Sequence, residues 1–187
     1  MTGAGKAFCA GVDLAKPPNP MEQATGDGAT NPTAQMAKCP FPIIGAVNGA
    51  AITGGFELAL ACDFLIGSTK ARFRDTHTKF AIAPCWGLSQ KLPRLVGAAR
   101  ARFASFSSAW INAETAQQWG LLVEVTEPEA LMDRARDIAA AIAENDEETV
   151  EYFKRVLNAG VKLPLADGLA FERQEAATFF KRLVADP

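Results

Sequence analysis

Residues 53–63 read TGGFELALACD and predict a short apolar helix over residues 54–61. An apolar run with the sequence FPIIGAV, residues 41–47, precedes this helix and ends at an Asn48-Gly49 turn, so we expect a buried strand there. Residues 64–66 and 71–73 predict two further short strands. Strand, helix and strand at this spacing indicate a layered α/β core.

The glycine-rich beginning of the chain predicts turns and loops. Residues 2–14 combine a glycine-rich turn with a short apolar segment and a helix start. Residues 16–38 are rich in proline, glycine and polar side chains and predict a long loop with a helical turn near Gln35. Loops of this length in compact domains are often lids or disordered segments.

Helices dominate the sequence after Trp86. We expect them at residues 112–118, 128–142, 147–159 and 165–184, with a strand at residues 121–125. Apolar residues at spacings of 4, 3 and 4 define one buried stripe on the second of these helices, formed by Leu131, Ala135, Ile138 and Ile142. The sequence therefore predicts an α/β core over residues 1–110 and a mainly helical region over residues 111–187.

The composition excludes several classes of protein. The 187 residues are 49% hydrophobic and 21% charged with a net charge of −2, which provides no basic surface for nucleic acid or for a membrane. No segment reads as a signal peptide or is long and apolar enough to cross a bilayer. Four cysteines without a CxxC pair, and a single histidine, do not suit a metal site. We expect a cytoplasmic protein with reduced thiols, no metal and no nucleic-acid or membrane partner.

Glycines and a carboxylate stand together at the start of the helix at residues 54–61. A bare backbone N–H group beside an acid can stabilise a developing oxyanion and move a proton nearby. The alternative is that Glu57 only complements the positive end of the helix dipole. Thr53 is a candidate N-cap, but Phe56 stands where a capping box would need Glu, so a capping box does not explain Glu57.

His77, the only histidine, is a second candidate for proton transfer. It follows the short strand predicted at residues 71–73. The alternative is a solvated or hydrogen-bonded surface histidine. Asp63 and Asp75 are expected to be turn or packing acids, and Trp86 a core or interface aromatic residue.

Two segments together resemble the signatures of the crotonase superfamily, the enoyl-CoA hydratase and isomerase group. Residues 2–14, TGAGKAFCAGVDL, resemble the first signature, and residues 46–63, AVNGAAITGGFELALACD, resemble the second. A weaker similarity continues through residues 84–97 and 113–125, so the resemblance covers nearly the whole chain. It implies a ββα spiral core over residues 1–110 and a helical C-terminal region over residues 111–187 that mediates assembly into a homotrimer or hexamer.

The resemblance also implies an oxyanion hole for the thioester carbonyl of an acyl-CoA substrate. Its two donors would be the backbone N–H groups of Val12 and Gly54. Such donors stabilise an enolate, and loss of one costs about 3 kcal/mol of transition-state stabilisation. Neighbouring residues of the two signatures are expected to contact the substrate, namely Ala10, Gly11, Asp13 and Gly55. No separate cofactor is expected, because CoA arrives as part of the substrate.

Enoyl-CoA hydratases of this family use two glutamates to place a water molecule and to exchange protons with the substrate. Glu57 matches the first position, whereas the second falls on His77. The resemblance implies hydration of a 2-enoyl-CoA to the 3-hydroxyacyl-CoA, with Glu57 positioning water or taking its proton and His77 as the second acid or base. Because a histidine stands at the second position, another reaction of a thioester enolate remains an alternative: isomerisation, dehalogenation, decarboxylation or thioester hydrolysis.

Family members carry further strands and a helix before the first signature. We therefore expect that the first strands of the spiral are missing here, either because the chain is a fragment or because Met1 is a wrongly assigned start. A shortened chain leaves a third function open, that of a non-catalytic acyl-CoA binder or subunit-interaction protein in which Glu57 is retained by descent.

Overall fold

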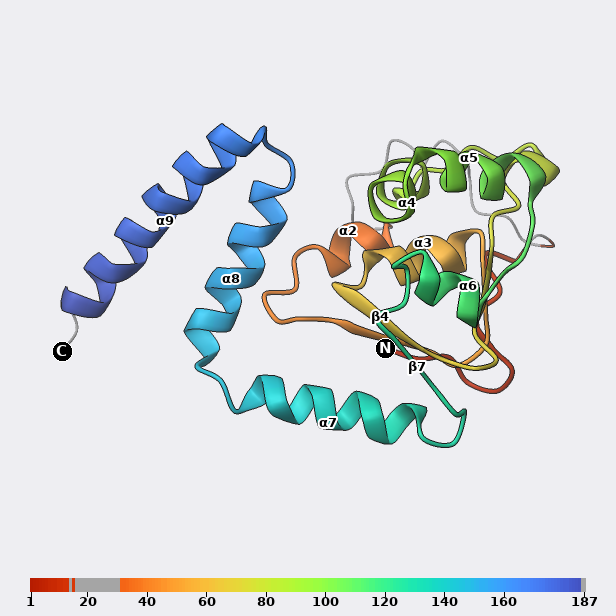
Figure 1. Ribbon diagram of the computed structural model, residues 1–187, viewed down its shortest axis with the longest axis horizontal. Helices are drawn as coiled ribbons and strands as arrows, with labels where there is room; N and C mark the ends of the chain where they lie inside the picture. The colour runs from red at the N-terminus through yellow and green to blue at the C-terminus, as the bar shows by residue number, and fades with distance from the viewer. Residues whose placement is uncertain (14, 16–30, 186–187) are drawn as a thin grey trace. The chain divides into compact units, whose positions relative to one another are not determined.

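A computed structural model describes residues 1–13, 15 and 31–185, so most of the loop predicted at residues 16–38 lies outside the described residues (Figure 1). The elements are, in chain order, β1 (Ala7–Cys9), α2 (Pro32–Met36), β2 (Ile44–Val47), β3 (Ala50–Ile52), α3 (Gly54–Ala61), β4 (Phe64–Ser68), β5 (Arg72–Arg74), the 3₁₀ turn η1 (Thr78–Phe80), α4 (Leu88–Val96), α5 (Ala98–Ser107), β6 (Ile111–Asn112), α6 (Ala113–Gln118), β7 (Glu124–Thr126), α7 (Leu131–Ala143), α8 (Glu147–Gly160) and α9 (Leu165–Ala185). The helical turn predicted near Gln35 is confirmed as α2.

Two small sheets organise the first part of the chain. In one sheet, β1, β3 and β5 are parallel neighbours and β6 runs antiparallel to β5. In the other, β2, β4 and β7 are all parallel. The helix α3 lies in sequence between the parallel partners β2 and β4, which confirms the predicted strand, helix and strand unit.

The strand β3 was not predicted. The Asn48-Gly49 pair leads from β2 in one sheet into β3 in the other, rather than from a strand into a helix. Asn48 holds this change of sheet, because its Nδ2 donates to the carbonyl oxygen of Gly5 at 3.0 Å and its Oδ1 accepts from the N–H of Gly3 at 3.1 Å. A methyl group on Gly49 would lie 2.2 Å from the carbonyl oxygen of Lys6, so only glycine fits this crossing.

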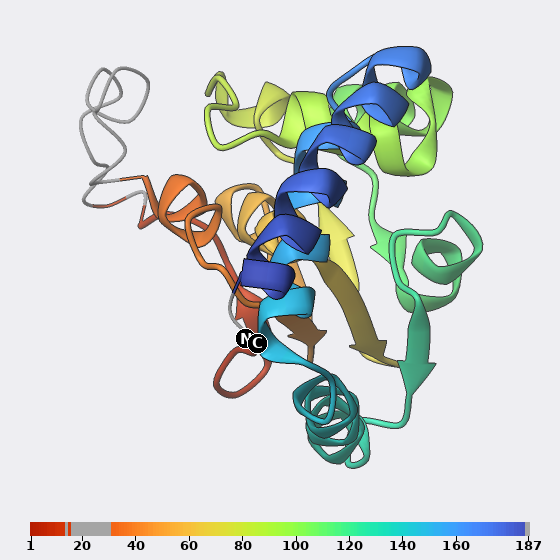
Figure 2. The ribbon, with the colours of Figure 1, turned by 90° about the vertical axis from the view of Figure 1, so that its left-hand side faces the viewer.

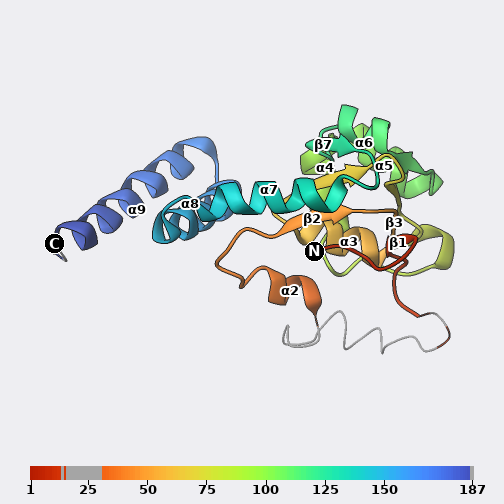
Figure 3. The same cartoon turned by 90° about the horizontal axis from the view of Figure 1, so that it is seen from below.

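Successive side chains of β2 and β4 point to opposite faces of their sheet, and both faces are buried, as in parallel sheets covered by helices on each side. On one face Val47 and Leu65 join the core that also contains Phe56 of α3. On the other face Ala46 and Ile66 pack with Leu131 of α7. Figures 1 and 2 show the same order, from α4 and α5 through α3 and the strands to residues 131–139 of α7, and Figure 3 shows β2 between α7 and α3.

Helix ends in the second half follow local sequence signals. Asn112 caps α6 by accepting from the N–H of Thr115 at 2.8 Å, as predicted. The helix expected from Pro128 begins instead at Leu131, because residues 128–130 form a turn. Leu131, Ala135 and Ile138 form its buried stripe.

The chain divides into two compact units. The first holds residues 1–39 and 43–139, and the second holds residues 40–42 and those from 140 onward. Within the second unit, the rings of Tyr152 in α8 and Phe179 in α9 lie 4.7 Å apart. The domain boundary predicted between residues 110 and 111 stays a prediction. Across the residues that the structure describes, no helix is long and apolar enough to span a membrane.

Candidate active site

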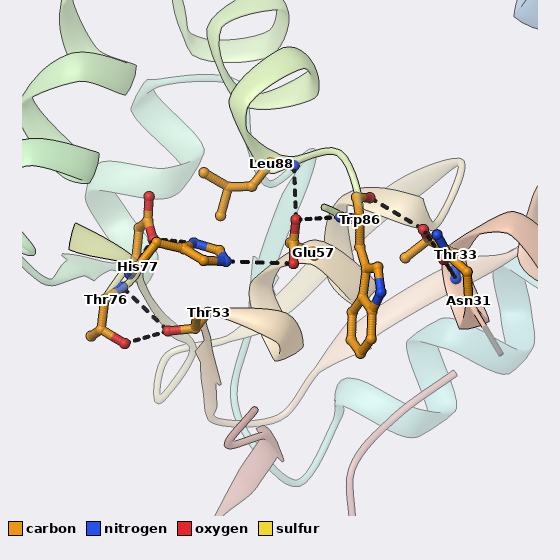
Figure 4. A network of polar contacts seen from close by, with 9 residues as sticks. Asn31, Thr33, Thr53, Glu57, Thr76, His77, Trp86 and Leu88 are labelled. Carbon is orange, nitrogen blue, oxygen red and sulfur yellow. Dashed lines mark hydrogen bonds and ion pairs between the residues drawn. The ribbon is translucent and has the colours of Figure 1, made fainter. Parts of the chain in front are cut away.

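Glu57 occupies the first turn of α3 and is only 2% exposed. One carboxylate oxygen, Oε1, accepts two hydrogen bonds from backbone N–H groups, those of Trp86 at 2.9 Å and Leu88 at 3.2 Å (Figure 4). The loop before α4 therefore fixes the carboxylate through main-chain atoms. The other oxygen, Oε2, faces His77.

His77 follows β5 and is 5% exposed, so the alternative of a surface histidine is wrong. Its Nε2 lies 3.7 Å from Oε2 of Glu57, and its Nδ1 lies 2.7 Å from Oδ1 of Asp75. The structure thus brings together the two residues that the sequence predicted for proton transfer, although they are twenty positions apart (Figure 4).

Asp75 is the functional candidate that the sequence interpretation missed. It is 2% exposed, and its Oδ1 accepts from both the backbone N–H of His77, at 3.0 Å, and the ring nitrogen. The expectation of a turn acid is confirmed, because Oδ1 accepts from the N–H two residues further on, but the carboxylate also bonds the imidazole of a site residue. The available signal was the spacing of two residues, which places side chains on one face of an extended segment.

The pKa values in this cluster follow from burial and charge. Burial opposes the charged imidazolium, but hydrogen bonds to Asp75 and Glu57 and their negative charges outweigh it and raise the pKa of His77 from 6.5 to about 9. Burial acts to raise the pKa of Asp75, yet hydrogen bonds from His77 and Ser105 hold it below its usual value. Burial, followed by the charge of Glu57, raises the pKa of the Cys85 thiol.

The two predicted oxyanion donors come from segments that the structure places side by side. Gly11 has φ of +97°, and a methyl group on it would lie 3.0 Å from the carbonyl oxygen of Ile52 and 3.9 Å from the nitrogen of Gly54. Val12 directly follows Gly11, and Gly54 is buried at the start of α3, where backbone N–H groups have no partner within the helix. The donor roles of Val12 and Gly54 stay predictions.

Thr53 occupies the N-cap position of α3, as predicted, but its side chain makes no capping hydrogen bond. Its φ of 53° is rare for a β-branched residue and turns the chain sharply from β3 into the helix. Its Oγ1 instead bonds the hydroxyl of Thr76 and accepts from the N–H of Thr76 at 3.2 Å. These bonds tie the start of α3 to the segment that carries His77.

The remaining predicted substrate contacts have different surroundings. Ala10, Gly11 and Val12 line a cavity of about 220 Å³ that also touches Thr53. Asp13 is exposed, and its Oδ1 accepts from the N–H of Ala15 at 2.9 Å, which forms a local turn.

Gly55 is buried, and a methyl group there would lie only 2.0 Å from the carbonyl oxygen of Cys9, so it lets α3 approach β1. Contact of Gly55, Ala10, Gly11 and Asp13 with a substrate stays a prediction.

Trp86 lies at this site, which composition and spacing did not indicate. A methyl group on Gly54 would lie 3.1 Å from Cζ3 of the Trp86 ring, so the ring covers the start of α3. The indole Nε1 is buried without a hydrogen-bond partner in the part of the chain that the structure describes. Across the same residues, no cluster of His, Cys, Asp and Glu is suited to hold a metal ion.

Fold and site together define an α/β enzyme with a buried carboxylate and histidine beside the start of a helix. A sequence profile of the family described as Enoyl-CoA hydratase/isomerase matches residues 1–184. The chain is 43% identical over 185 residues to the probable peroxisomal enoyl-CoA hydratase 1 of Arabidopsis thaliana, with 99% of this chain and 70% of that protein covered. It is 36% identical to the short-chain-enoyl-CoA hydratase of Clostridium acetobutylicum, with 93% of this chain and 68% of that protein covered.

Solved structures agree with these relatives. The enoyl-CoA hydratase subunit I of Geobacillus kaustophilus superposes with a TM-score of 0.86 at 33% identity, and the match covers 96% of this chain and 70% of that one. The chain belongs to the enoyl-CoA hydratase/isomerase family. The predicted crotonase-like fold and the enoyl-CoA hydratase-like class are therefore confirmed.

Proposed function

We propose that this chain adds water across the double bond of a 2-enoyl-CoA and forms the 3-hydroxyacyl-CoA. The observation that carries the proposal is the buried pair of Glu57 and His77, whose facing atoms lie 3.7 Å apart beside Gly54. A pair of groups at this separation can exchange protons with one water molecule and one substrate carbon. The hydratases named above supply the substrate class.

In this scheme the thioester carbonyl accepts hydrogen bonds from the N–H groups of Val12 and Gly54. The charge that develops on that oxygen when water adds to C3 is thereby stabilised, which lowers the barrier to the enolate. Glu57 takes a proton from the attacking water, and His77 gives a proton to C2. CoA enters as part of the substrate, and the reaction requires neither a metal nor a redox cofactor.

The test is hydration of crotonyl-CoA, followed as loss of absorbance of the conjugated thioester. Glu57→Gln and His77→Ala should each lower kcat on the order of 10²-fold or more, because each removes a proton-transfer group. Gln can still accept the N–H groups of Trp86 and Leu88, so Glu57→Gln should remain folded. Glu129→Gln, at an exposed position, is the matched control and should keep full activity.

Absence of hydration in a folded wild-type sample would contradict the proposed function. Unchanged activity of His77→Ala would remove His77 from the mechanism. Release of free CoA in the same assay would instead support the second candidate, thioester hydrolysis, which the histidine beside Glu57 favours over reactions that use two glutamates.

The proposal extends to assembly and compartment. A homotrimer or hexamer is supported by an exposed apolar stripe formed by Phe153 and Leu157 of α8 and by Val161, the C-cap of that helix. We also propose a cytoplasmic location. Because one relative is named as peroxisomal, imaging of a tagged chain in its own cell is the measurement that decides the compartment.

A further inference from the structure

We propose that Asp75 is a positioning residue of this site: it holds His77 with a proton on Nδ1 and aims Nε2 at Glu57. The inference rests on the hydration proposed above and assigns the direction of each proton transfer. His77 is the donor to the substrate carbon, and Glu57 is the base for water.

The geometry leaves His77 little freedom. Oδ1 of Asp75 accepts from the backbone N–H of His77 at 3.0 Å and lies 2.7 Å from Nδ1. A carboxylate oxygen that already accepts an N–H bond is an acceptor for Nδ1–H as well, so the ring proton is placed on Nδ1. Nε2 then remains as the atom that faces Glu57 (Figure 4).

Burial makes the charges of this cluster interdependent. The side chains of Asp75, His77 and Glu57 are 3%, 6% and 2% exposed. Two carboxylates flank one imidazole in this setting, which favours the imidazolium, and the raised pKa of His77 agrees with that charge. Among the described residues, the Cys85 thiol is a further titratable group that the charge of Glu57 affects, while α5 contributes the uncharged hydroxyl of Ser105 to Asp75.

The proton balance follows from these charges. The oxygen of water bonds to C3 while Glu57 takes one of its protons, and the electron pair of the double bond moves to the thioester as an enolate. Nε2–H of His77 then protonates C2, and the carbonyl re-forms. The proton held by Glu57 returns to Nε2, which faces the same carboxylate oxygen, so the site is regenerated and the substrate has gained one water.

The single histidine allows a direct test by NMR, on protein purified without a polyhistidine tag. Nitrogen-15 shifts should show His77 as imidazolium until the pH approaches about 9 in the wild-type chain. Asp75→Asn should move the titration of His77 down by more than one pH unit. Asp133→Asn, at an exposed position, is the matched control and should leave it unchanged. Titration near 6.5 in the wild-type chain, or no response to Asp75→Asn, would overturn the pairing.

Kinetics separate positioning from a purely structural role. Asp75→Asn should lower kcat for crotonyl-CoA on the order of 10²-fold at neutral pH with little change in KM, and should shift the alkaline limb of the pH profile to lower pH. Asp75→Glu should recover part of kcat. A folded Asp75→Asn variant with wild-type kcat and pH profile would refute the positioning role. Inactivity of the wild-type chain would contradict the proposed hydration alone, and the NMR titration would still decide whether Asp75 holds His77.

Discussion

At the residue scale, Gly54 is confined on two sides. The ring of Trp86 lies over it, and the loop that contains Gly11 lies beside it, since a methyl group on Gly54 would be 3.1 Å from Cζ3 of Trp86 and 3.9 Å from Cα of Gly11. The space that a side chain on Gly54 would fill is therefore occupied by an aromatic side chain from a loop more than thirty positions away. Any added atom must displace either the ring or the neighbouring loop.

Gly54→Ala should therefore lower kcat/KM for crotonyl-CoA on the order of 10²-fold, because the ring or the donor moves from its place. The measurement is steady-state kinetics of Gly54→Ala, Trp86→Ala and the double variant. The two substitutions should not be additive, because removal of the ring opens room for the methyl group. Strictly additive losses would contradict contact with Trp86 as the cause.

A second residue-scale prediction concerns stability and pH. The pKa of His77 is about 9 in the folded chain and 6.5 as an ordinary value, so the folded state binds the proton more tightly than the unfolded state. The resulting stabilisation is fully present below pH 6.5 and is lost as the pH rises through 9. Urea unfolding should give the wild-type chain a larger free energy of unfolding than His77→Gln at pH 6. Most of this difference in free energy should be lost by pH 9.5. An equal difference at both pH values would contradict the raised pKa.

At the element scale, the approach of α3 to β1 depends on Gly55. The carbonyl oxygen of Cys9 would lie 2.0 Å from a methyl group there, and this oxygen belongs to the backbone of a strand paired with β3. The strand cannot shift without disturbing its pairing, so the helix would have to move. Because Glu57 lies two residues further along α3, its distance to His77 would change as well.

Gly55→Ala should reduce the free energy of unfolding by about 2–3 kcal/mol. Gly160→Ala is the control, because a methyl group on Gly160, in α8, would meet nothing within 4 Å and should change stability by less than about 1 kcal/mol. Urea unfolding of the three proteins measures the difference. Equal stability of Gly55→Ala and wild type would show that α3 and β1 are not in the close contact described.

At the scale of the whole molecule, apolar side chains remain exposed on α8. Phe153, Leu157 and the C-cap residue Val161 are 58%, 61% and 76% exposed and recur every four residues, so they follow one face of the helix. A stripe of this kind is typical of a surface that another protein covers.

Leu157→Gln should therefore shift the chain from the proposed trimer or hexamer towards monomers. Sedimentation velocity over a range of protein concentrations measures this shift. Asn158→Gln, one position away at an exposed site, is the control and should assemble as the wild type does. A wild-type chain that is monomeric at all concentrations would contradict the proposed assembly.

The local sequence pattern was sufficient to predict several helices and strands. The helix α3 begins and ends at the predicted residues, and the strands on either side pair as expected, because a continuous apolar run between turns has few other ways to be buried. The cap of α6 was also predicted, since an N-cap is a bond between residues three apart. The family followed from two signatures that are contiguous in the chain.

The sequence by itself determined the family, the central helix and the two residues, Glu57 and His77, that are candidates for proton transfer. Only the tertiary structure decided that Trp86 adjoins them, that β3 exists and that the side chain of Thr53 makes no capping bond to α3. The physical reason is distance along the chain: the bonds that hold Glu57 join residues 29 and 31 positions apart. Sheet pairing and helix packing set such contacts, and no local preference encodes them.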